Sequence, residues 1–547
     1  MVRNKDIHKA KVSHSTQAVL IFLLLCCTCI STEGYFIDDY VLPKWAAIRL
    51  SVPVTAAFLI IVHRHNLKEI KVEACAVYLF LFILTAISCK EAIIPYLFFL
   101  ILSTFIFRYY NSESEFTIAI LISGIILLFK SIIQFYDNEP ITGGFDTSAA
   151  LALHLSLTSP YALKGTISNE YYYRKTYLCL CILYILMTTT VLIAVGSRLG
   201  IIAFCISAIL IFKPKKRLPA LLFVLGITTM CMHVKKDSTK GRSLIYYTSL
   251  TLIDSPHKAL FGLGEDGFNR EYMRRQSKVL KESPYEQGQL ADNIRHPLNE
   301  LLLAIINYGV LRVGGVVFIL VLVFRKTAIP TETKASISIL LLFAFFSYPF
   351  RYPIAWLILA KAAALSFSQP DRSHTNNRIV LFSILVISVT LIYNTIAETI
   401  WNREWEQAHE RARFANDKSA PAAYCALSKS QYADDMFYYD YAAVLLEHKQ
   451  SSQAIKILNN SATIDYDTQL LRGDIYADLH QYDKAISHYE EAASMCPNRF
   501  LPLYNQYKVY EEKKDTANMT SLRNVIINKT IKVPSYEIMQ MRHDVTH

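Results

Sequence analysis

The chain has 547 residues, of which 53% are hydrophobic and 18% are charged, and its mean hydropathy is +0.26. This composition excludes an ordinary soluble globular protein, because a soluble chain of this length carries more charge. The formal net charge of +11 does not indicate a nucleic-acid-binding protein. Its Lys and Arg residues lie mostly in short loops between apolar stretches, where such residues set membrane topology.

Apolar stretches fill the chain up to residue 400. About 20 apolar residues in a helix cross the ~30 Å hydrocarbon core, and lipid requires helices because it cannot satisfy backbone polar groups. We therefore expect an all-α protein, with a polytopic bundle of about 12–13 transmembrane helices over residues 1–399 and a soluble helical domain over 400–547. The predicted spans are 16–33, 44–62, 72–88, 92–108, 116–136, 147–164, 176–195, 199–213, 217–233, 299–323, 335–349, 352–368 and 378–399.

Loop charges predict the topology. With the basic N-terminus in the cytoplasm, nearly all of the cytoplasmic loops are basic, and the short outward loops carry mostly Asp and Glu. The long loop 234–298 then faces outward, and with thirteen spans the tail does as well. The first span could also serve as a signal peptide, but the weak cleavage site at 31–34 favours a retained helix.

The tail has helical periodicity and a repeat of about 31 to 32 residues. The similar segments are 447–458, 479–492 and 510–522, with Ala454, Ala485 and Ala517 at matching positions. A small residue there lets the two helices of a pair approach closely. The pattern resembles tetratricopeptide repeats, and the middle unit is the most specific, with Tyr482, Ala485, Tyr489 and Ala492 on one face and Pro497 closing the unit. Such repeats bind peptides or partner proteins, and a rigid cap without a partner is the alternative.

Cysteine spacing adds little. Cys425 and Cys496 are the only cysteines in the tail, and a disulfide between them stays open. The sequence contains no His/Cys cluster with zinc spacing.

Three places predicted to face outward carry candidate functional residues. The first is Gly196-Ser197-Arg198-Leu199-Gly200, between two apolar helices, where a tight turn with one snorkelling Arg is the structural alternative. The second combines Gly241-Arg242 with a run from Ser255 to Phe268, whose glycines, Gly264 among them, could form an anion-binding nest of backbone N–H groups.

The third place is Arg295-His296-Pro297-Leu298-Asn299, which enters the tenth predicted span. His296 and Asn299 would share a helix face if the helix began by Pro297. A helix-entry motif with Asn and Pro as boundary residues is the structural alternative.

Taken together in this order, the three places resemble the O-antigen ligase family of membrane glycosyltransferases, which includes O-antigen ligases, some O-antigen polymerases and bacterial protein O-oligosaccharyltransferases. The family pattern is a Ser-Arg-x-Gly turn, a Gly-Arg helix start, a glycine-containing stretch ending in Phe, and a His/Asn motif that opens the helix after the long periplasmic loop. The resemblance covers residues 15–400, with its core at 190–315. One departure is that the family's His directly precedes the Asn, whereas Leu298 holds that place here.

The resemblance implies a multi-pass protein of the bacterial inner membrane, with the tail in the periplasm. It also implies a glycan donor carried on undecaprenyl pyrophosphate. Arg198 and Arg242 would bind the pyrophosphate and stabilise its developing charge, with Arg295, Asn299 and Gly264 also in the substrate site. His296 would accept the proton of the acceptor hydroxyl, with His257 as the reserve candidate. Residues 15–400, which the resemblance covers, contain no Asp-x-Asp motif, so we expect an inverting reaction without metal or cofactor.

The acceptor is the open point. A periplasmic repeat domain favours Ser or Thr of a protein, ahead of ligation to lipid A core and of O-antigen polymerisation. A lipid-linked glycan transporter and a membrane-anchored scaffold are the alternatives from other classes. Sugar identity and oligomeric state cannot be read from the sequence.

Overall fold

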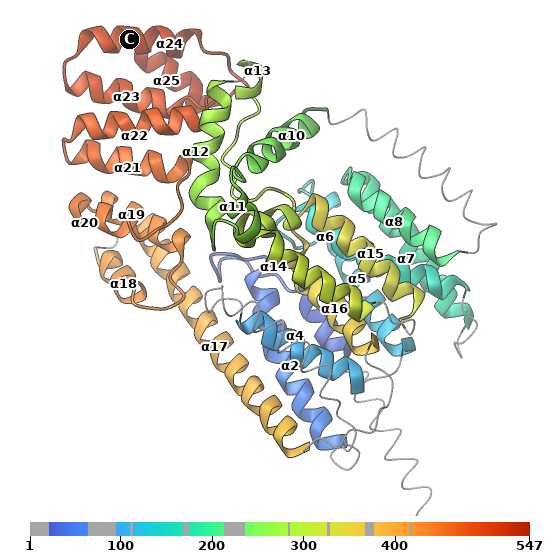
Figure 1. Cartoon of the computed structure of the whole chain (residues 1–547). Coiled ribbons are helices and arrows are strands. Elements are labelled where there is room, and N and C mark those ends of the chain that lie inside the picture. Colours follow the sequence, from blue (N-terminus) through green and yellow to red (C-terminus); the bar gives the residue numbers. More distant parts are fainter. Residues whose placement is uncertain are drawn as a thin grey trace, which may run out of the picture. The chain divides into compact units, whose positions relative to one another are not determined.

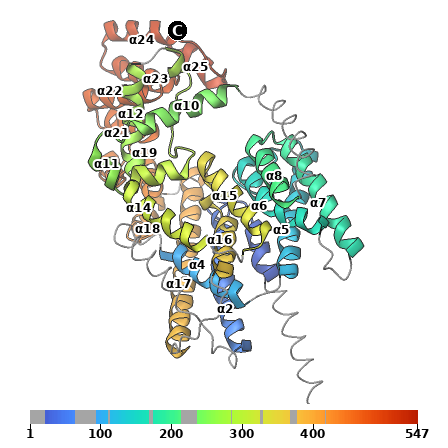
Figure 2. The same cartoon turned by 45° about the vertical axis from the view of Figure 1, so that its right-hand side comes forward.

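The computed structural model describes residues 21–63, 94–109, 113–167, 174–212, 236–282, 285–324, 329–366, 377–415 and 418–546. Every regular element in these ranges is helical, as expected. The predicted spans 72–88 and 217–233 and the start of the first span lie outside the described residues. Figures 1 and 2 show the helices in two views.

The chain divides into two compact units. The first, which we call the apolar unit, comprises Met1–Val234, Leu298–Leu301 and Gly314–Arg403. The second, which we call the repeat unit, comprises Lys235–Pro297, Leu302–Val313 and Glu404–His547. Residues 235–297, predicted to be a long loop, therefore belong to the same unit as the tail.

The described helices of the apolar unit agree with the predicted spans to within a few residues, except at the end of the longest of them. They are α2 (Leu42–His63), α4 (Ile94–Tyr109), α5 (Glu113–Tyr136), α6 (Ser148–Ile167), α7 (Arg174–Ala194), α8 (Arg198–Ile211), α15 (Thr331–Phe346), α16 (Pro353–Ser366) and α17 (Asn377–Ala415). Helix α17 continues beyond its apolar sequence to Ala415, because the polar residues that follow also favour a helix.

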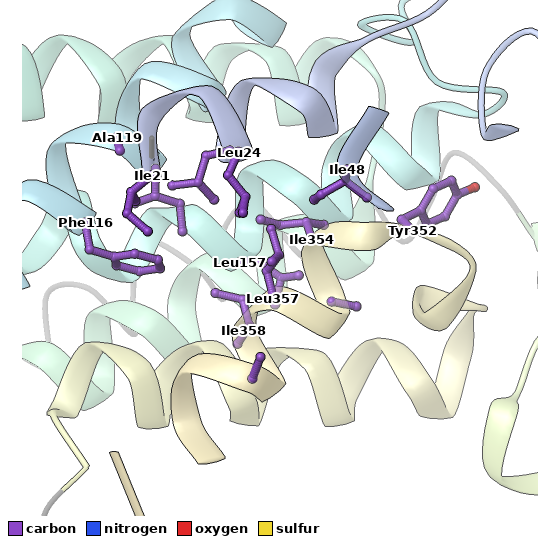
Figure 3. Packing of buried hydrophobic residues seen from close by; sticks show 14 of the residues in the cluster. Ile21, Leu24, Ile48, Phe116, Ala119, Leu157, Tyr352, Ile354, Leu357 and Ile358 are labelled. Carbon is purple, nitrogen blue, oxygen red and sulfur yellow. The ribbon is translucent and has the colours of Figure 1, made fainter. Parts of the chain in front are cut away.

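Helix α6 lies in the core of the apolar unit, and all of its residues from Ala150 to Leu163 are buried. A helix buried on every side must satisfy its own polar groups. Pro160 cannot donate to the carbonyl of Ser156, and the Ser159 hydroxyl donates to that carbonyl instead (2.9 Å). Figure 3 shows Leu157 of α6 among apolar residues of other segments, including Leu24, Ile48, Phe116 and Ile354.

Among the described residues, four helices are long and apolar enough to cross a membrane, namely those that contain Leu42–Ile61, Glu115–Tyr136, Lys175–Ala194 and Leu381–Arg413. The apolar helices Ile94–Arg108, Arg198–Ile211 and Pro353–Leu365 are shorter. Helices α7 and α17 keep much of their apolar surface exposed. The exposed side chains include Leu183, Leu186 and Ile193 on α7 and Phe382, Val389, Tyr393 and Ile400 on α17.

The repeat unit begins with α10 (Lys236–Leu250), α11 (Pro256–Phe261), α12 (Gly267–Lys281) and α13 (Tyr285–Gly288) and includes part of α14 (Glu300–Phe324). After the end of α17 it contains α18 (Ala420–Leu427), α19 (Asp435–Glu447), α20 (Ser451–Leu458), α21 (Tyr466–Asp478), α22 (Tyr482–Met495), α23 (Leu501–Glu512), α24 (Thr516–Asn528) and α25 (Tyr536–Thr546). Figure 1 shows α21 to α24 stacked side by side.

Three helix pairs, α19–α20, α21–α22 and α23–α24, share one turn geometry. A residue with positive φ follows the first helix of each pair, and the amide after it donates to the carbonyl five residues earlier, as in a Schellman motif. The turn residues are Lys449 (φ 59°), His480 (φ 54°) and Lys514 (φ 58°). Three repeat-like units are therefore present in the tail.

The predicted alanine register holds in two of these pairs. Ala454 and Ala485 are completely buried, each four residues after the amide that closes its turn. In the third pair that position is Met519, and Ala517 is exposed, so the prediction for Ala517 was wrong. The tail cysteines, Cys425 and Cys496, are both free, so they do not form the disulfide that the sequence left undecided.

Candidate functional site

The Ser-Arg-x-Gly motif forms the start of α8. Ser197 is the N-cap and accepts a hydrogen bond from the amide of Gly200 (3.2 Å), while Gly196 makes the preceding turn with φ 65°. A Cβ on Gly200 would lie 2.7 Å from Leu192 and 3.2 Å from Ala152 of α6. Gly200 therefore permits close packing of α8, and Ser197 satisfies its first turn.

Arg198 is the first residue of this helix. Its side chain is partly buried, and its Nη2 atom is buried without a hydrogen-bond partner among the described residues. A buried guanidinium nitrogen without an acceptor is costly. It lies at a helix N-terminus, where exposed amides and the helix dipole favour an anion.

Arg242 lies inside α10, which begins at Lys236, so the expectation that Gly241-Arg242 starts a helix was wrong. The side chain of Arg242 hydrogen-bonds Tyr246 one turn later. Burial raises the pKa of Tyr246, and Arg242 opposes that shift. A Cβ on Gly241 would meet nothing within 4 Å, so no close packing requires this glycine.

The glycine-rich run packs against a kink in α14. Gly309 interrupts that helix with φ 78° and ψ 162°. The amides of Leu263 and Gly264 donate to the carbonyls of Ile306 (2.8 Å) and Asn307 (2.9 Å), next to the interruption. A Cβ on Gly309 would lie 2.2 Å from the Leu260 carbonyl oxygen, so the two backbones are in direct contact.

This geometry uses the N–H groups that an anion-binding nest would need. Besides Leu263 and Gly264, the amide of Phe268 donates to Asn307 Oδ1 (3.0 Å). Gly264, with φ 86°, shapes the loop but directs its amide to α14. Arg270 completes the loop by donating to the carbonyls of Leu263 (2.9 Å) and Glu265 (2.8 Å). Sequence reasoning missed both Asn307 and Arg270, although a polar Asn two residues before a Gly in an apolar run was a usable signal.

The third motif is irregular in structure. Helix α14 begins at Glu300, not by Pro297, so His296 and Asn299 do not share a helix face. Leu298, which holds the place of the family's His, has φ 53°. His296 is partly buried, and the following Pro297 is buried.

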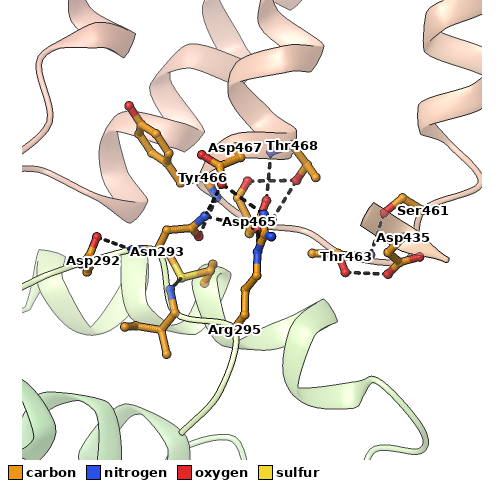
Figure 4. A network of polar contacts seen from close by, with 12 residues as sticks. Asp292, Asn293, Arg295, Asp435, Ser461, Thr463, Asp465, Tyr466, Asp467 and Thr468 are labelled. Atoms are coloured by element: carbon orange, nitrogen blue, oxygen red, sulfur yellow. Dashed lines mark hydrogen bonds and ion pairs between the residues drawn. The ribbon is translucent and has the colours of Figure 1, made fainter. Parts of the chain in front are cut away.

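Arg295 has carboxylate partners in the tail helices α18 to α25, which we call the repeat domain. Its Nε atom lies 2.9 Å from Asp465 Oδ2, and its Nη2 atom lies 3.1 Å from Asp467 Oδ2. Asn293 donates to Asp467 (2.8 Å) and accepts from the amide of Tyr466 (3.3 Å). Figure 4 shows this network at the start of α21. The guanidinium expected to bind pyrophosphate is therefore engaged by two carboxylates.

The reserve candidate, His257, lies in α11 and is exposed. Its ring centroid is 5.1 Å from that of Phe261 in the same helix. Of the predicted site residues, Arg198 and Asn299 belong to the apolar unit. The others belong to the repeat unit, namely Arg242, His257, Gly264, Arg295 and His296.

A second feature of the repeat unit is a cavity of about 570 Å³ between α12 and α22. Its lining is charged or carries hydroxyl groups, with Arg274, Lys278 and Lys281 on α12 and Glu490 and Glu491 on α22. Small-molecule sites are mostly apolar with a few polar groups, so this lining is not typical of one.

Comparison with known proteins identifies one segment. A tetratricopeptide repeat family model matches residues 466–499, which contain α21 and α22. Within it, Gly473, Tyr476, Ala485, Tyr489 and Pro497 occupy the spacing typical of that repeat. No curated protein and no solved structure matches the chain.

Proposed function

We propose that the chain is a polytopic membrane glycosyltransferase of the bacterial inner membrane. It moves a glycan en bloc from undecaprenyl pyrophosphate to an acceptor hydroxyl on the periplasmic side, with Ser and Thr of proteins as the preferred acceptors. The observation that carries the proposal is Arg198, whose buried Nη2 atom lacks an acceptor among the described residues and lies at the N-terminus of α8. A phosphate oxygen supplies both the missing acceptor and the negative charge.

The membrane location is supported by the exposed apolar side chains of α7 and α17. In water this surface would favour aggregation, whereas in a bilayer it contacts lipid. An undecaprenyl chain between such helices would bring its pyrophosphate to the membrane boundary.

In the proposed reaction the acceptor oxygen attacks the anomeric carbon, and the bond from that carbon to the pyrophosphate oxygen breaks. The electron pair leaves with the pyrophosphate, where Arg198 and Arg242 stabilise the charge. His296 accepts the proton from the acceptor hydroxyl. Because a single displacement occurs, the configuration at the anomeric carbon inverts. Arg295 is left out of the phosphate-binding set because of its two carboxylate partners.

The first test measures binding of undecaprenyl pyrophosphate to the purified full chain in lipid nanodiscs. We expect Arg198→Ala to weaken binding about tenfold or more, since hydrogen bonds to charged groups contribute about 1.5–3 kcal/mol. The matched control is Lys175→Ala, which removes an exposed cation from the first turn of α7. Undecaprenol, which lacks phosphate, should bind wild type and Arg198→Ala equally. Equal pyrophosphate affinity of these two proteins would refute the phosphate assignment.

The second test compares glycans in a deletion strain with those of the parent. Loss from periplasmic proteins supports protein glycosylation, whereas loss from lipopolysaccharide redirects the proposal to a ligase. Shortened chains indicate a polymerase. Unchanged glycans in all three measurements contradict the enzymatic proposal and favour a transporter or a scaffold.

A further inference from the structure

We infer that Arg295 is a positioning residue and that the repeat domain holds the chain's own segment 291–297. In the proposed function this segment carries the candidate base, His296. The consequence for catalysis rests on that proposed function, but the docking itself does not.

The first observation is the contact with the start of α21. Asp465 is the N-cap of this helix, forms a capping box with Thr468, and has a side chain only 2% exposed. Its Oδ2 atom accepts from Arg295, so the buried cap carboxylate has a counter-ion from segment 291–297. A charge-assisted bond to a buried acceptor is stronger than an exposed ion pair.

The second observation is electrostatic. Burial and the neighbouring Asp465 raise the pKa of Asp467, and Arg295 opposes both effects. Two carboxylates within one helical turn repel each other unless a cation lies between them. Arg295, with Nε on one carboxylate and Nη2 on the other, supplies that cation.

The third observation is that side chains from other elements bind both the backbone and a carboxylate at the other end of the segment. Asn498 Nδ2 donates to the carbonyl of Ala291 (2.8 Å), and Arg499 Nη2 lies 2.8 Å from Asp292 Oδ1. Gln276 of α12, 1% exposed, donates to the carbonyls of both Asp292 (3.0 Å) and Met495 (2.9 Å).

These contacts hold segment 291–297 at two points, the start of α21 and the turn after α22. At both points, side chains of the repeat domain form hydrogen bonds or ion pairs with polar groups of the segment. A bound peptide would be held by contacts of the same kind. His296 directly follows the residue that makes the bidentate contact. The repeat domain therefore acts in cis as a support for the candidate base.

The test uses hydrogen–deuterium exchange on the full chain in nanodiscs, read from peptides that cover 289–297. We compare Arg295→Gln with Arg274→Gln. Both arginines have side chains that are 49% exposed and form ion pairs in the repeat unit. Arg274, however, lies on α12 and pairs with Glu491 of α22, outside the segment 291–297. We expect Arg295→Gln to accelerate exchange about tenfold and Arg274→Gln to change it less than twofold.

Kinetics then separate positioning from ligand binding. If Arg295 positions the segment, Arg295→Gln lowers kcat of transfer and leaves KM for the lipid donor nearly unchanged. Unchanged exchange together with weaker binding of undecaprenyl pyrophosphate would overturn the inference and make Arg295 a ligand-binding residue. If wild type transfers no glycan, the proposed function fails, but the exchange measurement still decides whether the segment is docked.

Discussion

In each unit a glycine admits a tyrosine from a neighbouring helix, but the two tyrosines bond differently. In the apolar unit, a Cβ on Gly124 would lie 2.3 Å from the Tyr184 hydroxyl, which hydrogen-bonds Thr158 (2.5 Å). In the repeat unit, a Cβ on Gly473 would lie 2.3 Å from the ring of Tyr489, whose hydroxyl donates to Asp474 (2.7 Å). Helix packing thus follows one rule in both units, whereas the polar partners change from hydroxyl to carboxylate.

The same difference extends through both units. Many hydroxyls of the apolar unit donate to the carbonyl four residues earlier in their own helix. Examples are Thr55, Thr104, Ser131, Thr158, Ser207 and Thr395. In the repeat unit, carboxylates cap helices and connect separate segments. A hydroxyl that donates to a carbonyl of its own helix is suited to lipid, because lipid offers no hydrogen-bond partners. Charged carboxylates are stable beside water.

The largest effect should come from a buried charge pair in the apolar unit, which departs from this pattern. Arg49 of α2 has a side chain only 3% exposed, and its Nη1 atom lies 2.9 Å from Glu398 Oε2 of α17. The guanidinium also lies over the rings of Trp45 (4.8 Å) and Tyr96 (4.3 Å). Glu398→Gln leaves the buried cation without a counter-ion, so we expect a loss of about 3 kcal/mol in unfolding free energy. Unfolding in a fixed detergent measures it.

The matched control is Asp483→Asn in the repeat unit. Asp483 pairs with Lys513 (2.7 Å), but its side chain is 93% exposed. Solvent screens this pair, so the unfolding midpoint should shift far less than in Glu398→Gln. Equal shifts in the two variants would show that the environments of the two ion pairs do not differ as described.

The sequence predicted helices well where one local signal was sufficient. Helix α5, expected at 116–136, spans Glu113–Tyr136, and helix α16, expected at 352–368, spans Pro353–Ser366. Hydropathy ended the last span at residue 399, whereas α17 continues to Ala415, because hydropathy detects apolar residues and not helix formation. The helices within 234–298 were missed for the same reason, although Phe268, Tyr272 and Val279 have helical spacing in α12.

The candidate site depends more on contacts between distant residues. The role of Ser197 as a cap could be read locally, since Ser is a common N-cap residue. The partners of Arg295 are Asp465 and Asp467, about 170 positions later, and no spacing rule predicts such a pair. The contact of Gly262 with the kink at Gly309 is likewise visible only in three dimensions.

A smaller effect is expected at Gly473, where packing in the repeat can be tested by one methyl group. The Cβ of Gly473→Ala would lie 2.3 Å from Cε1 and 2.5 Å from Cδ1 on one edge of the Tyr489 ring, which cannot withdraw like a flexible side-chain end. Overpacking costs about 1–3 kcal/mol and the gain in helix propensity is about 1 kcal/mol, so we expect a net loss of up to about 2 kcal/mol.

The control for this substitution is Gly241→Ala, also in a helix of the repeat unit. Its Cβ would meet nothing within 4 Å, so only the gain in helix propensity applies. Thermal unfolding of the full chain should therefore show opposite shifts for the two variants. A loss at both positions would contradict the packing argument.

The smallest effect is a pH dependence confined to the middle repeat. His488 stacks on Tyr476 (centroids 5.3 Å apart, planes at 1°), and its Nδ1 atom lies 2.7 Å from Gln469 Oε1. Burial, followed by the nearby Arg472, lowers the pKa of His488 below its usual 6.5. The folded state thus favours neutral imidazole. Its contribution to stability is present above pH 6.5 and is lost as the pH falls from 6.5 through the lowered value.

We therefore expect amide exchange in peptides from α21 and α22 to become faster in wild type between pH 7 and pH 5, after correction for the intrinsic pH dependence of exchange. His488→Gln should flatten this response, because the amide keeps a polar partner for Gln469 and does not titrate. His480→Gln, at an exposed histidine in the turn between these two helices, should leave the response unchanged. A response that persists in His488→Gln would move the pH sensitivity to the neighbouring partly buried carboxylates, such as Asp474, whose pKa is raised by burial.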